Sequence, residues 1–481
     1  MSEMTVKAAE GVQLTRREPG QAAEAVMRLL RTPSGRQGVY WRGGELMLWA
    51  GSRWRVLSVV EAMDLMLLLL KDAVVIKRTE DDGERKVRLS PSVGFVEDTL
   101  RFVQAMARTD SDVPGWKNGS GGEPDAAWCI PFEDVVLDVK TGKTWTRDET
   151  WFGTMVLPVR YEDLEGAKAE RWAKCVEQWA CGDAEWGPLL QMSLGYMLMP
   201  VRRLRKCLLI QGETGGGKGV IQHVVRAMMG RALQISNMEA LADKHGTVGL
   251  GSAQGLWVPE VTKGRGESAR TVARLFKEIV GEDGLTINPK FGQVERGVKC
   301  GAMLVMTSNV VPQLENERGG LTNKMLMLPI RKSFDKGGAE VGLKDRLVRE
   351  ELAGIVGWAV EGARRVAKEV EERGEVKWPK PEVGVEMEEA FLVENSPVAA
   401  FQAVCFEKAA KGFVAGELVR RAWKAWVRDQ LRGREPEGVS EHNLLTKLED
   451  QGMWGVVKSR NGSGGSRGMR GMVLRATRKV E

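Results

Sequence analysis

The feature that most constrains this chain is a glycine-rich loop between an apolar and an amphipathic stretch, at residues 206–229. CLLIQ predicts a strand, GETGGGK has the G-x-x-x-x-G-K spacing of a phosphate-binding loop, and VIQHVVRAMM predicts a helix. In such a loop, backbone N–H groups and the helix N-terminus favour phosphate, and the lysine adds a positive charge. The predicted nucleotide-binding residues are Gly212, Thr214, Gly215, Gly217, Lys218 and Gly219.

Two later segments supply the polar groups that a P-loop enzyme needs. Residues 255–260, GLWVPE, predict a short strand ending in Glu260, and residues 302–309, AMLVMTSN, predict one ending in Asn309. Hydrolysis needs an acid that holds metal or activates water, and a polar group near the γ-phosphate. Taken alone, Glu260 is typical of an exposed strand end and Asn309 of a turn. Their order behind the P-loop favours catalytic roles for both.

Between these segments, residues 274–299 predict a helix ending near Gly281 and then two short strands around residues 288–292. Lys290 and Phe291 fall at the tip of this hairpin, and Lys277 lies on the preceding helix. A basic and an aromatic side chain together favour contact with a single nucleic-acid strand, through phosphate contact and base stacking. Without that context, the pattern is typical of an ordinary surface hairpin.

Composition excludes several other classes of site. The net charge of +6 is small for 481 residues, but the C-terminal end, residues 455–481, is strongly basic and includes Arg467 and Arg470. That end either meets phosphates or is a solvated tail. Six cysteines without a C-x-x-C pair and three scattered histidines support neither a disulfide framework nor a zinc site. The longest apolar run near the start, residues 65–70, is too short for a membrane span, so we expect a cytoplasmic protein without membrane contact.

In order, these motifs resemble those of superfamily 3 helicases, specifically the phage, plasmid and large-DNA-virus replication group whose helicase is often fused to a primase. The resemblance covers most of the chain. It runs through residues 132–162, the segment leading into the P-loop, residues 255–261, the hairpin, and the segments MLVMTSNVVP and GGLTNKMLMLPI. Residues 396–474 resemble that group's terminal winged-helix-like domain.

The resemblance implies an α/β fold: an AAA+-like (RecA-like) ATPase core, with an α+β N-terminal domain and a C-terminal winged-helix-like domain. The expected boundaries are 1–162 for the N-terminal helicase-associated domain, 163–372 for the core with its preceding helical segment, 373–394 for a linker, and 395–481 for the DNA-binding domain.

The resemblance also implies an ATP-dependent DNA helicase. It would be a homo-hexamer with ATP and Mg²⁺ between subunits, acting on single-stranded and forked DNA beside a separate primase or polymerase, in the host cell cytoplasm if phage-encoded. By the same resemblance Lys218 binds phosphates, Glu260 serves the metal and catalysis, and Asn309 senses the γ-phosphate. Lys290 and Phe291 would lie on the pore hairpin.

The chain departs from the family pattern at three places. Gly219 replaces the hydroxyl that usually meets Mg²⁺, although Thr214 lies within the loop. Pro259 leaves the single acid Glu260 where the family usually has two. Asn323 and Lys324 stand where the family often has arginine, so the candidates for the group that reaches the neighbouring ATP are Lys324, Arg318 and Arg331. The departures keep two alternatives open: an ATP-binding loading or scaffolding ring with weak hydrolysis, and, less favoured, a P-loop phosphotransferase.

Overall fold

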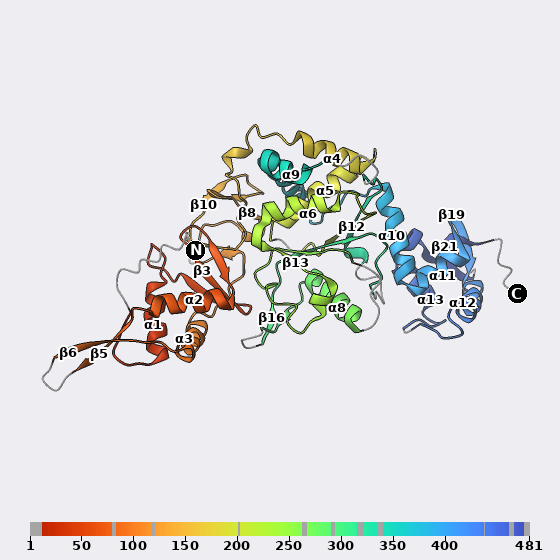
Figure 1. Cartoon of the computed structure of the whole chain (residues 1–481). Coiled ribbons are helices and arrows are strands. Elements are labelled where there is room, and N and C mark those ends of the chain that lie inside the picture. Colours follow the sequence, from red (N-terminus) through yellow and green to blue (C-terminus); the bar gives the residue numbers. More distant parts are fainter. Residues whose placement is uncertain are drawn as a thin grey trace.

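The computed structural model describes residues 12–78, 83–117, 119, 121–200, 203–261, 267–289, 294–314, 322–334, 340–436, 438–460 and 466–475. Three units follow one another from one end of the molecule to the other (Figure 1): an N-terminal unit, a central unit around a parallel sheet, and a C-terminal unit.

The N-terminal unit combines three helices with two small sheets, ordered β2-β3-β4 and β1-β5-β6. Its core is a separate cluster of buried apolar side chains contributed by all three helices and by the strands. Helix α2 begins at a capping box in which Ser58 and Glu61 bond each other's backbone N–H groups. The elements are β1 (Gln13–Leu14), α1 (Pro19–Leu29), β2 (Val39–Arg42), β3 (Glu45–Trp49), β4 (Trp54–Leu57), α2 (Val59–Leu70), β5 (Val74–Arg78), β6 (Glu84–Arg88) and α3 (Val93–Met106).

A second set of short strands follows, and its core differs from that of the first unit. Trp128, Phe132 and Leu157 are buried in the same cluster as the helices and sheet of the central unit. The expected boundary at residue 162 therefore does not separate two cores, because several apolar side chains between residues 128 and 159 belong to the core of the central unit. These strands are β7 (Gly115–Trp116), β8 (Cys129–Pro131), β9 (Val135–Asp138), β10 (Thr144–Thr146) and β11 (Trp151–Phe152).

The central unit is built on a five-stranded sheet in the order β13-β14-β17-β12-β18, and every neighbouring pair is parallel. Alternate residues of its strands enter two clusters: Leu208 and Ile210 face one, and Cys207 and Leu209 face the other. Helices cover both faces (Figure 1), which explains why the strands are continuously apolar. The elements are α4 (Glu170–Ala180), α5 (Trp186–Leu198), β12 (Cys207–Gly212), α6 (Lys218–Met229), β13 (Leu233–Ile235), α7 (Met238–Ala242), β14 (Gly255–Val258), α8 (Glu267–Gly281), β17 (Met303–Ser308), β18 (Met325–Ile330) and α9 (Leu343–Arg373).

The predicted hairpin is present at its root. Strands β15 (Leu285–Ile287) and β16 (Glu295–Val298) pair antiparallel after α8, with Leu285 opposite Val298 and Ile287 opposite Glu295. It lies on the side of the central unit that faces the N-terminal unit (Figure 1).

The segment expected as a linker is largely helical. Residues 382–394 form most of α10 (Glu382–Asn395), and Met387 and Phe391 are buried against one face of the central sheet. Their spacing of four residues places both side chains on one face of the helix, which explains why this segment packs.

The C-terminal unit has its own core and an antiparallel sheet in the order β19-β21-β20. Its elements are α11 (Pro397–Cys405), β19 (Phe406–Ala415), α12 (Gly416–Gln430), α13 (Leu444–Asp450), β20 (Val457–Arg460) and β21 (Arg467–Leu474). Across the described residues of all three units, no helix has both the length and the apolar character that a membrane span requires.

Candidate nucleotide-binding site

The glycine-rich loop lies at the carboxyl edge of the parallel sheet, between the end of β12 and the start of α6. Gly217 caps α6 with a φ of +100°, a conformation that glycine adopts without steric cost. A Cβ atom at this position would lie 2.4 Å from Nε1 of Trp179, a buried side chain on α4. Trp179 therefore packs directly against the loop backbone, and any side chain at residue 217 would displace it.

Lys218 is held at the centre of the loop. Its half-buried ammonium group donates hydrogen bonds to the carbonyl oxygens of Gly212 and Glu213, the latter at 2.8 Å, and to Oδ1 of Asn309 at 2.7 Å. Burial lowers the pKa of Lys218, and the charge of Glu260 partly raises it again. The structure thus brings together three of the residues singled out in the sequence: Lys218, Asn309 and Glu260.

Glu260 and Asn309 come from adjacent strand ends. Glu260 follows β14 with a positive φ of 53° and an exposed side chain, and Asn309 follows β17. The Val261 N–H donates to the Thr307 carbonyl at 2.8 Å, and the Ser308 hydroxyl donates to the Val261 carbonyl at 2.5 Å. These bonds fix the two strand ends to each other, so Ser308 has a structural role at this edge.

The other catalytic candidates lie apart from this group. Lys324 precedes β18 and so lies at the amino edge of the sheet, whereas the P-loop follows β12 at the carboxyl edge. Arg331 follows β18 on the P-loop side, but its exposed guanidinium pairs with Glu386 on α10. Within one chain, the geometry therefore joins neither cation to Lys218. Arg318 lies outside the described residues.

The DNA-binding candidates fall in three places. Lys290 and Phe291 lie outside the described residues. Lys277 is exposed on α8. Arg467 and Arg470 are exposed on β21 in the C-terminal unit, where they pair in register with Arg460 and Val457 of β20.

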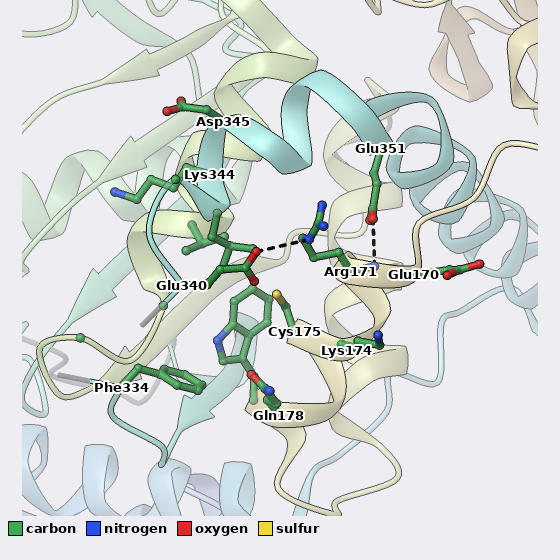
Figure 2. A pocket seen from close by; sticks show the side chains of 16 residues that line it. Glu170, Arg171, Lys174, Cys175, Gln178, Phe334, Glu340, Lys344, Asp345 and Glu351 are labelled. Carbon is green, nitrogen blue, oxygen red and sulfur yellow. Dashed lines mark hydrogen bonds and ion pairs between the residues drawn. The ribbon is translucent and has the colours of Figure 1, made fainter. Parts of the chain in front are cut away.

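A pocket of about 720 Å³ opens beside the P-loop. That volume lies within the range of small-ligand sites. Figure 2 shows its walls: α4 on one side, the start of α9 on the other, and Phe334 at one end. The Phe334 N–H donates to the Gly215 carbonyl at 3.2 Å, so the pocket continues directly from the loop.

Charged contacts hold the pocket walls together, between α4 on one side and α9 with the segment just before it on the other. Arg171 pairs with Glu340 at 3.5 Å and with Glu350 at 3.0 Å. Glu351 accepts from the backbone N–H groups of Arg171 and Trp172 at 3.0 and 2.9 Å, which caps the start of α4 (Figure 2).

Several of these residues escaped the sequence analysis. Trp179, Phe334 and Lys344 belong to segments without a recognisable motif. A Cβ atom added to Gly219 would lie 3.5 Å from Lys344 Nζ. An ammonium group therefore stands beside the position where the loop lacks a hydroxyl. Only the packing of α9 against α6 could reveal this.

Comparison with known proteins adds a likeness to solved structures. No family profile and no curated protein matches the sequence. Among solved structures, the apo C-terminal region of NrS-1 (residues 305–718) is similar with a TM-score of 0.44 and 10% identity, over 95% of this chain and 100% of that one. Another apo structure of the same region gives 0.44 and 10% over 94% and 99%, and a third gives 0.42 and 11% over 87% and 84%. At these scores the likeness assigns no function to this chain.

Proposed function

We propose that this protein is an ATP-dependent DNA helicase of the superfamily 3 type, acting in the replication of a phage, plasmid or other mobile element. One observation carries the proposal: Lys218 of the P-loop bonds Asn309 at the end of the adjacent strand, with the charge of Glu260 acting on the same ammonium group. Phosphoryl transfer depends chiefly on positioning and on charge stabilisation, and this trio offers a cation, a polar side chain and an acid at one edge.

The geometry of the loop supports the nucleotide-binding part of the proposal. Gly217, pressed against Trp179, keeps the loop free of side-chain bulk, and the start of α6 supplies N–H groups to phosphates. Lys218 would exchange its loop carbonyls for phosphate oxygens, and the base would enter the pocket beside Trp179 and Phe334.

Mg²⁺ would arrive with the nucleotide, because this ion is commonly held by one or two carboxylates plus phosphates and water. Glu260 is the residue that would hold it, and the ion would neutralise charge on the phosphate oxygens. The described residues contain no cluster of three or more His, Cys, Asp or Glu that could bind a metal by itself.

The DNA and assembly parts of the proposal rest on the resemblance in sequence. Exposed Arg467 and Arg470 on the paired strands of the C-terminal unit support a phosphate contact there. A homo-hexamer would place Lys324 or Arg331 of one subunit toward the ATP of the next. The mass of the particle with and without ATP measures this assembly.

The decisive experiment is steady-state ATP hydrolysis in Mg²⁺, with and without single-stranded DNA. We expect DNA to stimulate wild-type turnover, and Lys218→Ala to lower turnover by about 100-fold or more, since it removes the cation on the developing charge. Lys143→Ala changes an exposed lysine in the β9–β10 turn and serves as the matched control. Wild-type turnover no higher than that of Lys218→Ala would contradict the proposed ATP-dependent helicase.

A second candidate function is a ring that binds ATP and loads or scaffolds other replication proteins while hydrolysing slowly. Gly219, which lacks the hydroxyl, and the single acid Glu260 favour it. ATP binding at normal affinity together with negligible turnover would select this candidate over the helicase.

A further inference from the structure

The turn between β2 and β3 of the N-terminal unit docks on the root of the β15–β16 hairpin. Gly43 and Gly44 form this turn with φ of +59° and +79°, values typical of a two-residue hairpin connection. A Cβ atom on Gly44 would lie 2.7 Å from Pro289 Cγ, and one on Gly43 would lie 3.3 Å from Val298 Cγ1. The turn therefore approaches the hairpin so closely that a side chain at Gly44 would force Pro289 to shift, and one at Gly43 would be tightly packed.

Arg42 fastens the turn to the central unit. Its guanidinium donates to the carbonyl of Gly251 at 2.6 Å, of Ser111 at 2.9 Å and of Lys299 at 3.5 Å. Lys299 directly follows β16, so one of these bonds reaches the end of the hairpin strand itself. Arg42 thus joins three segments that lie far apart in the sequence.

Trp41 contacts the opposite end of β16. Its indole Nε1 donates to Oε1 of Glu295, the first residue of β16, at 2.8 Å. The ring is buried, and its backbone is held by bonds with Ala107 and Thr109 at 2.8 and 3.0 Å. Bonds from adjacent residues of β2 therefore hold both the first residue of β16 and the residue that follows its last.

We propose that Trp41 and Arg42 are positioning residues that hold the β15–β16 hairpin against the N-terminal unit and set the direction in which it meets single-stranded DNA. The DNA part rests on the proposed function. A short two-stranded hairpin is marginally stable by itself, so its orientation depends on what its root contacts. Here that contact is a turn with no side-chain bulk, flanked by two directed hydrogen-bond donors.

The first arm of the test is hydrogen exchange in Trp41→Phe, which keeps an aromatic ring but removes the N–H donor. Loss of a hydrogen bond to a charged acceptor predicts about tenfold faster amide exchange in residues 285–298. The control is Trp145→Phe, because Trp145 Nε1 is buried without a partner among the described residues. Unchanged exchange in residues 285–298 of Trp41→Phe, with the protein folded, would overturn the proposal.

The second arm uses the same variants in ATP hydrolysis. We expect Trp41→Phe to reduce the DNA stimulation factor several-fold while basal turnover and ATP affinity stay at wild-type values. Faster exchange with full DNA stimulation would overturn the link to DNA. If the wild-type protein shows no DNA-stimulated hydrolysis, the proposed helicase fails, and hydrogen exchange still decides whether Trp41 holds the hairpin.

Discussion

Lys218 and Arg42 both donate hydrogen bonds to main-chain carbonyl oxygens, but their partners lie at very different distances along the chain. Lys218 bonds carbonyls 6 and 5 residues away in its own loop, whereas Arg42 bonds carbonyls 69, 209 and 257 residues away. The carbonyl bonds of Lys218 lie within one loop, whereas those of Arg42 connect β2 to three distant segments. The first cation is thus available to a ligand, and the second joins parts of the fold.

We expect the largest difference between Arg42 and Lys218 in their contributions to the free energy of unfolding. Arg42→Ala leaves up to three carbonyls without their donor and should lower the free energy of unfolding by about 2–3 kcal/mol. Lys218→Ala should change it by less than about 1 kcal/mol. Urea unfolding measures both, with Arg101→Ala, an exposed partner of Asp98, as the control. Equal losses from Arg42→Ala and Lys218→Ala would contradict a structural role for Arg42 that Lys218 lacks.

The next effect tests whether the loop around Lys218 needs its close contact with Trp179. Gly217→Ala places a Cβ atom against the indole, so we expect ATP affinity to fall about tenfold or more, with a backbone strain of about 1–3 kcal/mol. Gly182→Ala is the matched control, since Gly182 has φ of +89° and no atoms within 4 Å of an added Cβ. ATP titration should show a loss only for Gly217→Ala.

We expect the smallest effect from Glu45, near Arg42, as a pH dependence of the free energy of unfolding. Burial raises the pKa of Glu45 to about 7, against the opposing effects of Ser252 and Arg42 and with the nearby Glu295 adding to the rise. Because the folded-state pKa exceeds the unfolded value, Glu45 contributes full stability at low pH and loses it as the pH rises through about 7.

Between pH 6 and 8 this loss should amount to about 1 kcal/mol in wild type. Glu45→Gln imitates the neutral acid and should flatten the dependence, while the exposed Glu84→Gln should leave it unchanged. Chemical unfolding at several pH values measures this dependence. If the free energy of unfolding of Glu45→Gln still falls with pH as in wild type, another group is responsible.

Local sequence patterns anticipated the elements around the P-loop. The predicted strand and helix correspond to β12 and α6, and the polar ends of β14 and β17 meet at Lys218 because parallel strands end at one edge. The hairpin strands also fall within the predicted segment. These features depend on short-range pattern and on strand direction, both of which a sequence displays.

Other features depend on contacts between distant segments. Trp179 meets Gly217, and Lys344 meets Gly219, only because α4 and α9 pack beside α6. The contacts of Arg42 and Glu45 are of this kind, since nothing local in the sequence shows what the turn between them docks against. The position of Lys324, in contrast, follows from the sequence. Lys324 precedes its strand, so strand direction alone places it at the edge of the sheet opposite the P-loop.

Helix α10 connects the edge of the candidate nucleotide site to the C-terminal unit. Its last residue, Asn395, accepts from the Leu314 N–H at 2.6 Å and donates to the Pro312 carbonyl at 2.9 Å, in the loop that starts at Asn309. Ser396 alone separates α10 from α11. A helix of 14 residues, about 21 Å long, thus connects to the C-terminal unit through a single residue. The C-terminal unit is therefore tied by a short, bonded path to the loop that follows Asn309.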